Sequence, residues 1–563
     1  MKEIKNGSDL SIANALQRHY EKIGKKDERP NVLIIMTDQQ RHDTIAHLGN
    51  DHMITPNLDR LAREGCSYTN AYTPNPICCP ARHSFLTGIS TGNHGIADND
   101  FNARLAPDIV TFPRILSQGD YVTEAIGKMH FQPCREHHGF QRLKLMEEVP
   151  EHREDDDYLL YLKEMGYGNV QNIHGVRNLL FYAPQTPVIP EEHHGTTWVT
   201  DRGLEFIDSN AGKRPFLLYL SYISPHPPFN CYNKYSDLYK EKDIPKPAES
   251  QTPLCELSKE NKMFGDLPNE KYIRRMRESY YGLITQIDYN IGRIIKSIED
   301  NGELDNTLII FTSDHGDFIG DYGLYQKFLP YDSCARIPLL VRYPKSFDKG
   351  TVKEEFVDLT DIFPTVLDIS ELDYKGNYPL VGESLISKNK RKDRTHQYVA
   401  YSEGNRRWAS VRNKEYKYNY YYGGGKEELF DLVDDPSETT NLLYSIESKE
   451  ILEIKNSLRR KLVQYEKEQW KAEYIVNDDF IVLDDYKAVA TRNKAFPVFG
   501  KNIKNKSDKE NLNDFIDEVI RAVEGEDLVK FEDLDYKAWQ KNGNFSEEDL
   551  ERLFNKRYKN KNF

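Results

Sequence analysis

Short apolar runs alternate with longer helical patterns over the first two thirds of the chain. The first run covers residues 31–36, Asn-Val-Leu-Ile-Ile-Met, and comparable runs follow at residues 121–127, 216–224, 307–312 and 337–343. Helical periodicity separates them, at residues 55–63, 196–209 and 269–298. Continuous apolar runs of this length are typical of strands buried on both faces. Their alternation with helices predicts an α/β fold with a large, mostly parallel sheet flanked by helices.

The composition changes near residue 397, where short runs rich in tyrosine and tryptophan begin. Residues 415–422 alternate like a half-solvated strand, which predicts a smaller C-terminal antiparallel-sheet subdomain. Residues 512–523 form an amphipathic pattern within the charged final stretch and predict a helical extension there. Two aperiodic stretches, 134–194 and 230–269, are expected to be insertions around a pocket mouth. The predicted units are a polar N-terminal extension (1–30), an α/β domain (31–395), an antiparallel β subdomain with a helix (396–470) and a charged, helical extension (471–563).

Charge and cysteine content narrow the class of protein. The 563-residue chain has a formal net charge of −14, which argues against a nucleic-acid-binding protein with a basic surface. Its seven cysteines have no disulfide-like spacing, which favours a reducing compartment. Residues 1–30 contain no apolar run of signal-peptide length, and no later segment has the length of a membrane span. We therefore expect a cytoplasmic protein with no nucleic-acid or membrane partner.

Residues 75–88 carry the most informative chemistry. Cys78 and Cys79 precede Pro80, and Pro80 favours the first turn of a helix, predicted over residues 80–89. A helix N-terminus stabilises negative charge, and Arg82 adds donors for a sulfate or phosphate group. A thiol in that field would be acidified. On these residues alone, two buried structural cysteines are an equally good interpretation.

Polar residues also follow several predicted strands directly. Ligands in such sheets gather beyond the carboxyl ends of the strands. The residues at these ends are Asp38, Lys128, His226 and Asp314, the last followed by His315. Asp with His at a strand end is a credible metal pair once Asp38 arrives from a neighbouring strand.

The pattern Cys78-x-Pro80-x-Arg82, followed by Leu86-Thr87-Gly88, resembles the signature of the sulfatase family within the alkaline phosphatase superfamily. The resemblance continues in order through Gly127-Lys128-Met129-His130, Ser224-Pro225-His226, Asp314-His315 and Lys327, with a looser match at Asn99. It spans residues 31 to 443. It implies an alkaline phosphatase-like fold whose catalytic domain is residues 31–395, with Cys78 converted to formylglycine by a maturation enzyme.

The same resemblance implies a divalent metal site. Its ligands would be Asp38, Gln39, position 78, Asp314 and His315. Gln39 and His315 replace residues common in other sulfatases and are closer to the phosphonate monoester hydrolase and choline sulfatase branches. Oxygen ligands with one imidazole suit calcium best, with manganese and magnesium still open.

The resemblance predicts hydrolysis of a small-molecule or sugar sulfate ester by a formylglycine hydrate at position 78. Arg82, Lys128 and Lys327 would hold the sulfonyl oxygens, and Asn99 would bind nearby. His226 would protonate the leaving alcohol, and His130 would take a proton from the second hydrate hydroxyl. A phosphonate monoester or phosphodiester hydrolase is the alternative, although Lys128 favours sulfate. A binding protein with an unmodified Cys78 is a third reading, and a homo-oligomer stays open.

Overall fold

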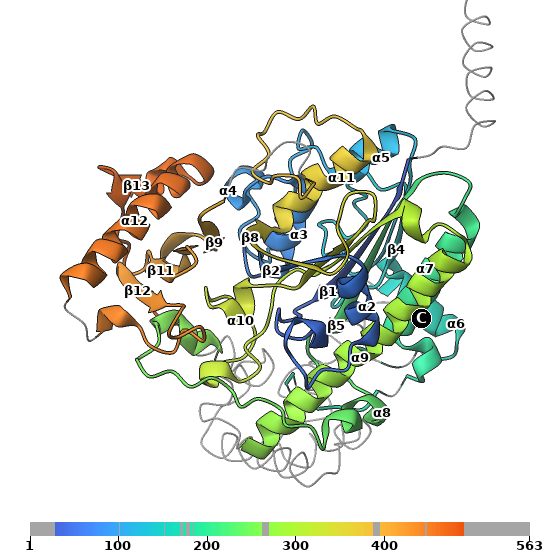
Figure 1. Ribbon diagram of the computed structural model, residues 1–563, viewed down its shortest axis with the longest axis horizontal. Coiled ribbons are helices and arrows are strands. Elements are labelled where there is room, and N and C mark those ends of the chain that lie inside the picture. The colour runs from blue at the N-terminus through green and yellow to red at the C-terminus, as the bar shows by residue number, and fades with distance from the viewer. Residues whose placement is uncertain are drawn as a thin grey trace, which may run out of the picture.

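The large sheet has eight strands, in the order β4-β3-β5-β1-β6-β7-β2-β8 (Figure 1). The computed structural model describes residues 29–488, apart from 101, 151–152, 169, 171–172, 176–180, 183, 188, 262–269, 387–393 and 445–447. The strands are β1 (Asn31–Asp38), β2 (Cys66–Tyr72), β3 (Val122–Gly127), β4 (Arg142–Leu145), β5 (Phe216–Pro225), β6 (Thr307–Ser313), β7 (Leu339–Arg342) and β8 (Thr351–Asp358). All five strands predicted for this sheet are present.

Strand direction confirms a mostly parallel sheet. β4, β3, β5, β1 and β6 pair in parallel, and so do β2 and β8. β7 is the exception, since it runs antiparallel to both β6 and β2. β2, β4 and β8 were not predicted, because their polar positions interrupt the apolar run; in β8, for example, Lys353, Glu354 and Glu355 interrupt it.

Alternation along β1 feeds two separate cores. Val32, Ile34 and Met36 pack toward one helix layer, whereas Leu33 and Ile35 pack toward the other. The first layer contains α3 (Cys78–Thr87), α5 (Phe112–Gln118) and α11 (Ile362–Ser370), and the second contains α2 (Pro56–Glu64), α7 (Gly195–Asn210) and α9 (Glu270–Asp300). Figure 1 shows strands of the sheet between α3 and α11 on one side and α2, α7 and α9 on the other. Shorter helices are α4 (Thr91–His94), α6 (Asp157–Glu164), α8 (Asn233–Ser236) and α10 (Asp332–Ala335).

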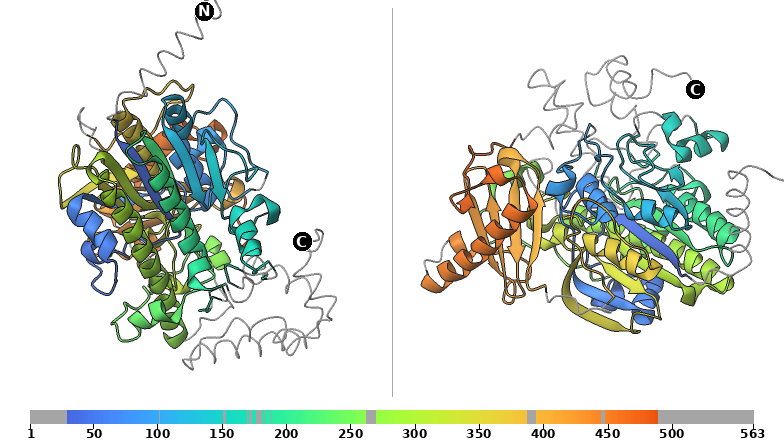
Figure 2. Two further views of the ribbon diagram at one scale, coloured as in Figure 1. Left: turned by 90° about the vertical axis from the view of Figure 1, so that its right-hand side faces the viewer. Right: turned by 90° about the horizontal axis from the view of Figure 1, so that it is seen from above.

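A second, four-stranded antiparallel sheet lies beside the large domain, coloured orange in Figure 2. Its strands are β9 (Gln397–Tyr401), β10 (Trp408–Arg412), β11 (Tyr416–Tyr421) and β12 (Lys426–Asp431), and α12 (Lys449–Gln469) packs against it. This confirms the predicted C-terminal subdomain. The next segment forms a small hairpin, β13 (Ile475–Val476) with β14 (Asp479–Phe480), where a helical extension was expected. The helix predicted at residues 512–523 lies outside the described residues, as do residues 1–28.

A buried ionic cluster joins the two sheets. Asp332 of α10 accepts hydrogen bonds from Lys417 Nζ at 2.7 Å and from Arg412 Nη1 at 3.0 Å. Lys417 is also 2.7 Å from Glu438, and these side chains are nearly excluded from solvent. Removing one member would leave a buried charge unpaired, so the cluster fixes how the second sheet meets the first. Among the described residues, no helix combines the length and apolar character that a membrane span requires.

Candidate active site

Helix α3 places Cys78 at its first residue, in the bend that follows β2. The predicted helix began two residues too late, because the structure starts α3 at Cys78 and ends it at Thr87. Ile77, at the N-cap, offers no side-chain hydrogen bond; the Cys79 backbone N–H donates to Asn99 Oδ1 at 2.9 Å instead. Asn99 thus serves the helix N-terminus next to Cys78. Cys78 is only 1% exposed.

Four potential metal ligands converge at the carboxyl ends of β1 and β6. One atom each from Asp38, Cys78, Asp314 and His315 lies within 4.8 Å of the others, the only such group among the residues described. Cys78 Sγ is 3.3 Å from His315 Nε2 and 3.9 Å from Asp38 Oδ1. His315 Nδ1 is 3.0 Å from the Gly316 carbonyl, an arrangement that leaves Nε2 facing the cluster.

The electrostatics of the two carboxylates fit a cation. Burial, with the charge of Asp38 next, raises the pKa of Asp314. Burial also opposes ionisation of Asp38, yet Lys128 and the other nearby cations outweigh it and hold the pKa of Asp38 well below its usual range. A divalent cation between two buried carboxylates and an imidazole would relieve their repulsion.

Arg82 contacts these carboxylates directly. Its Nε donates to Asp314 Oδ2 at 2.9 Å and its Nη2 to Asp38 Oδ2 at 3.1 Å. Nη1 donates to the Lys128 carbonyl and to Ser221 Oγ, both at 2.8 Å. Every guanidinium nitrogen therefore has a protein partner, and Arg82 is 1% exposed. In this geometry Arg82 holds the two carboxylates in place, and its predicted contact with sulfonyl oxygens stays a prediction.

Two lysines flank Cys78 on its other sides. Lys327 Nζ is 3.2 Å and Lys128 Nζ 3.8 Å from Cys78 Sγ. Burial is the largest influence on the Cys78 thiol and opposes its ionisation, but these lysines reverse that effect and lower its pKa well below the usual value. The acidified thiol expected from the sequence is thus supported, with the lysines as its main physical cause.

Gln39 adopts a left-handed backbone conformation, with φ of 66°. Its Oε1 accepts a hydrogen bond from Lys327 Nζ at 2.6 Å. Its Nε2 donates to Tyr182 Oη at 3.2 Å and also to Asp317. The amide oxygen predicted as a metal ligand therefore orients Lys327 here, and its ligand role stays a prediction.

His130 and His226 approach from β3 and β5. β3 ends at Gly127, and His130 has φ of 59°, so Lys128 and His130 lie in a bend after the strand. Glu147 Oε1 fixes this bend by accepting the backbone N–H groups of Met129 and His130 at 2.8 and 2.9 Å.

His226 follows β5 and is 5% exposed. Its Nδ1 is 2.6 Å from the Pro227 carbonyl, which assigns the proton to Nδ1 and leaves Nε2 for a ligand. Burial lowers the pKa of His226 to about 3, against the opposing charge of Glu148. The imidazole is therefore neutral at pH 7 in the free protein.

Two further acidic residues belong to the site and were missed from sequence. Glu148 is 2.6 Å from Lys128 Nζ and 3.5 Å from His226 Nδ1. Asp317 accepts from Gln39 and, at 2.7 Å, from Tyr182 Oη. Glu148 follows β4, so recognition of that strand would have placed it at the same sheet edge. Asp317 follows Asp314-His315-Gly316 and could have been found as part of that loop.

Comparisons with known proteins identify the family of this chain. The family model described as Sulfatase matches residues 30–372, well over half of the chain. This chain belongs to the sulfatase family. A second model, N-sulphoglucosamine sulphohydrolase, C-terminal, matches residues 320–468 and so covers all four strands of the second sheet.

Individual relatives of this sulfatase include enzymes that act on sulfate esters and members of the wider superfamily. It is 32% identical to an arylsulfatase of Clostridium perfringens over 75% of this chain and 92% of the relative. It is 30% identical to the multifunctional alkaline phosphatase superfamily protein PehA of Trinickia caryophylli, over 74% of this chain and 91% of the relative. The phosphonate monoester hydrolase structure of Agrobacterium radiobacter shares the fold, with a TM-score of 0.68, 22% identity and coverage of 81% and 99%. The chain is thus a sulfuric ester hydrolase with an alkaline phosphatase-like fold.

The loop that carries Lys327 in this sulfatase depends on distant segments. Gln326 and Phe328, on either side of Lys327, have φ of 68° and 88°, and a bulky residue in that region is strained. Trp408 Nε1, from β10 of the second sheet, donates to the Phe328 carbonyl at 2.7 Å. Asn261 Nδ2 donates to the carbonyls of Lys327 and, at 2.8 Å, Tyr325. These two side chains hold the strained loop, so that Lys327 reaches Cys78.

Three buried histidines lie close together, with His83 on α3 itself. His83 is 5.6 Å from His138 and 6.2 Å from His94 between ring centroids. Burial lowers the pKa of His83 to about 4 and that of His138 to about 3. Burial likewise lowers the pKa of His94 well below its usual value. The sulfatase therefore keeps this group uncharged, and the group links the packing of α3 to pH.

Proposed function

We propose that this sulfatase hydrolyses sulfate esters through a formylglycine formed from Cys78. The observation that carries the proposal is the position of the two lysine ammonium groups, 3.2 and 3.8 Å from Cys78 Sγ, beside the four-residue ligand cluster. Cys78 Sγ marks where an oxygen of the hydrated aldehyde would lie. A sulfate ester brought to this position meets two cations at the nucleophile.

The ligand cluster supports a divalent cation, with calcium preferred and manganese or magnesium as alternatives. Asp38, Asp314 and His315 would hold it together with position 78, while Arg82 keeps both carboxylates oriented. When bound, the cation would polarise the sulfonyl group and acidify the hydrate. Two carboxylates, one imidazole and the oxygens of a hydrate form a donor set that these metals accept.

The remaining residues act on protons and charge. Lys128 and Lys327 would neutralise the sulfonyl oxygens. Asn99 would bind the substrate nearby through Nδ2, since its Oδ1 already accepts the Cys79 N–H. His226 would present Nε2 to the leaving oxygen; the arriving anion and Glu148 both favour its protonation against the effect of burial. His130 would take a proton from the second hydroxyl of the hydrate, so that sulfate is expelled and the aldehyde returns.

A phosphonate monoester or phosphodiester hydrolase remains the second candidate. Tetrahedral phosphoryl and sulfonyl groups need similar donors, so the same site could act on either. The Asp38-Gln39 and Asp314-His315 pairs keep this candidate open, because they resemble those of the phosphonate monoester hydrolase branch. The sulfated-sugar relatives favour sulfate: one is an N-acetylglucosamine-6-O-sulfatase of Bacteroides thetaiotaomicron, 25% identical over 79% of this chain and 88% of the relative. We therefore place a sugar or small-molecule sulfate ester first.

The test compares initial rates on 4-nitrophenyl sulfate and 4-nitrophenyl phenylphosphonate. The protein is co-expressed with a formylglycine-generating enzyme, and mass spectrometry of the tryptic peptide 64–82 establishes how much Cys78 has been converted. We expect faster turnover of the sulfate, lost in Cys78→Ala and Cys78→Ser. Faster phosphonate turnover would support the second candidate. Multiple turnovers by Cys78→Ala would overturn the formylglycine mechanism, and fully converted protein inactive on both substrates would contradict both candidates.

A further inference from the structure

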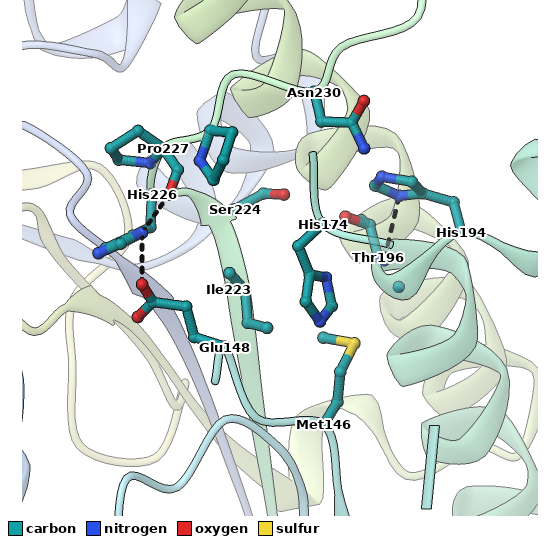
Figure 3. A pocket seen from close by; sticks show the side chains of 12 residues that line it. Met146, Glu148, His174, His194, Thr196, Ile223, Ser224, His226, Pro227 and Asn230 are labelled. Carbon is teal, nitrogen blue, oxygen red and sulfur yellow. Dashed lines mark hydrogen bonds and ion pairs between the residues drawn. The ribbon is translucent and has the colours of Figure 1, made fainter. Parts of the chain in front are cut away.

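The ammonium group of Lys128 is held by charged partners. Its Nζ lies 2.6 Å from Asp38 Oδ2 and 2.6 Å from Glu148 Oε2. Figure 3 shows the Glu148 carboxylate in contact with His226, whose Nδ1 is 3.5 Å from Glu148 Oε1. Both oxygens of a carboxylate accept hydrogen bonds, so turning either carboxylate over would still leave Lys128 with an acceptor.

The ammonium group of Lys327 is held by a neutral amide instead. Its Nζ donates to Gln39 Oε1 at 2.6 Å and lies 3.2 Å from Cys78 Sγ. The two ends of a carboxamide have nearly the same shape, but the oxygen accepts hydrogen bonds whereas the nitrogen only donates them. If the Gln39 amide turned over, its nitrogen would face the ammonium group, donor against donor. The position of Lys327 therefore depends on what fixes the orientation of Gln39.

Two acceptors fix the nitrogen end of this carboxamide. Gln39 Nε2 donates to Asp317 Oδ2 and, at 3.2 Å, to Tyr182 Oη. The Tyr182 hydroxyl donates its own proton to Asp317 Oδ2 at 2.7 Å, so its oxygen can accept from Gln39. Asp317 Oδ1 in turn accepts the Ile319 backbone N–H at 2.8 Å. The side chains of Gln39, Tyr182 and Asp317 are 0% exposed, so water does not compete for these groups.

We propose that Asp317 is a positioning residue for the hydrolysis of sulfate esters. Asp317 determines which end of the Gln39 carboxamide faces Lys327, and so places that ammonium group beside Cys78. The inference rests on the proposed function, because Lys327 is assigned to the sulfonyl oxygens there. Tyr182 assists by keeping Asp317 in place, so the aperiodic stretch 134–194 contributes a side chain to the interior of the site.

The test exchanges the donor and the acceptor between positions 39 and 317. Asp317→Asn places an amide nitrogen opposite Gln39 Nε2, and Gln39→Glu places a carboxylate opposite Asp317 Oδ2. The double variant Gln39→Glu/Asp317→Asn pairs a donor with an acceptor again, keeps an oxygen for Lys327 and has the formal charge of the wild type. The new amide at position 317 cannot turn over without loss, because the Ile319 N–H requires an oxygen.

We expect each single substitution to lower kcat/KM on 4-nitrophenyl sulfate about tenfold or more, and the double variant to lie within about threefold of the wild type. Rates are compared per converted Cys78. The affinity for inorganic sulfate, measured by calorimetry, should follow the same order, which a role in packing alone would not produce. Thermal unfolding establishes that each variant is folded. If Asp317→Asn is not, the double variant must still exceed Gln39→Glu about tenfold in kcat/KM.

Asp288→Asn is the matched control. Asp288 is also a buried aspartate, and it accepts the Leu58 backbone N–H at 2.7 Å from its place on α9. Combined with Gln39→Glu, its effect should multiply without any rescue. Losses that also multiply in the Gln39→Glu/Asp317→Asn variant would overturn the positioning role while leaving the sulfatase function intact. Converted wild type inactive on both the sulfate and the phosphonate would instead contradict the proposed function, and the sulfate affinities would then decide the role of Asp317.

Discussion

Replacing His138 by asparagine should make the protein more resistant to acid. His138 is 5% exposed, its ring centroid lies 4.5 Å from that of Phe131, and burial lowers its pKa to about 3. In the unfolded chain a histidine titrates near its ordinary value of about 6.5. Between these values the unfolded state binds more protons, so the folded state loses stability as the pH falls from about 6.5 toward 3.

The magnitude follows from the two pKa values. For a folded pKa of 3, lowering the pH from 8 to 5 removes about 2 kcal/mol from the free energy of unfolding. Below pH 3 both states are protonated and the slope vanishes. His83, with a pKa of about 4, adds a loss of similar size, so the two histidines together cost about 4 kcal/mol at pH 5. That is a large fraction of the stability of a typical domain.

The assay is urea unfolding of the complete protein at pH 8 and pH 5. Asparagine suits position 138 because its backbone φ is 44°. His138→Asn lowers stability at both pH values through lost packing, yet the difference between the two should shrink by about 2 kcal/mol. The exposed His47→Asn serves as the control and should leave the difference unchanged. A pH difference in His138→Asn equal to that of the wild type would refute the reasoning.

Three further predictions concern the site. Trp408→Phe removes the hydrogen bond to the Phe328 carbonyl, so the free energy of unfolding should fall by about 1–3 kcal/mol and kcat/KM on 4-nitrophenyl sulfate by about tenfold or more. Trp198→Phe is the matched control, because Trp198 Nε1 has no partner among the described residues. Equal losses of kcat/KM in the two variants would contradict a specific role for Trp408. Arg82→Lys leaves one of two carboxylates without its partner, and kcat/KM should fall about 100-fold or more, whereas near-normal activity would contradict the bridging role. Dialysis against a chelator should lower the melting temperature, with recovery on adding calcium at 100 times its Kd worth about 2.7 kcal/mol; a matching recovery in Asp314→Asn would place the cation elsewhere.

Much of the large sheet could be predicted from sequence, because strands buried on both faces are continuously apolar. Strand β1 contributes alternate residues to two cores, so it carries no polar position between Asn31 and Thr37. β4 escaped detection because its sequence, Arg-Leu-Lys-Leu, is only partly buried at the sheet edge. The antiparallel direction of β7 could not be predicted, since a buried strand has the same apolar pattern in either direction.

The site residues were predictable where chemistry and strand ends coincide. Asp38 and Asp314 converge because β1 and β6 are neighbours in the sheet. The partners of Arg82 were not predictable, because an arginine near an anion site serves equally well to bind a ligand or to orient carboxylates. The choice depends on distances of 2.9 and 3.1 Å that only the fold provides. Glu148 was not predicted as a site residue, because β4, which precedes it, was not recognised.

The hydrogen bond from Trp408 to the Lys327 loop also affects when the site can form during synthesis of the chain. Trp408 is synthesised 81 residues after Lys327, a delay of roughly 4 to 16 s at ordinary translation rates. During that interval the Phe328 carbonyl lacks its indole partner, and the strained backbone on either side of Lys327 lacks one of its two supports. Until Trp408 has been synthesised, the loop that positions Lys327 beside Cys78 is incompletely held. We therefore expect a nascent chain to become active only after the last third of the protein has been made.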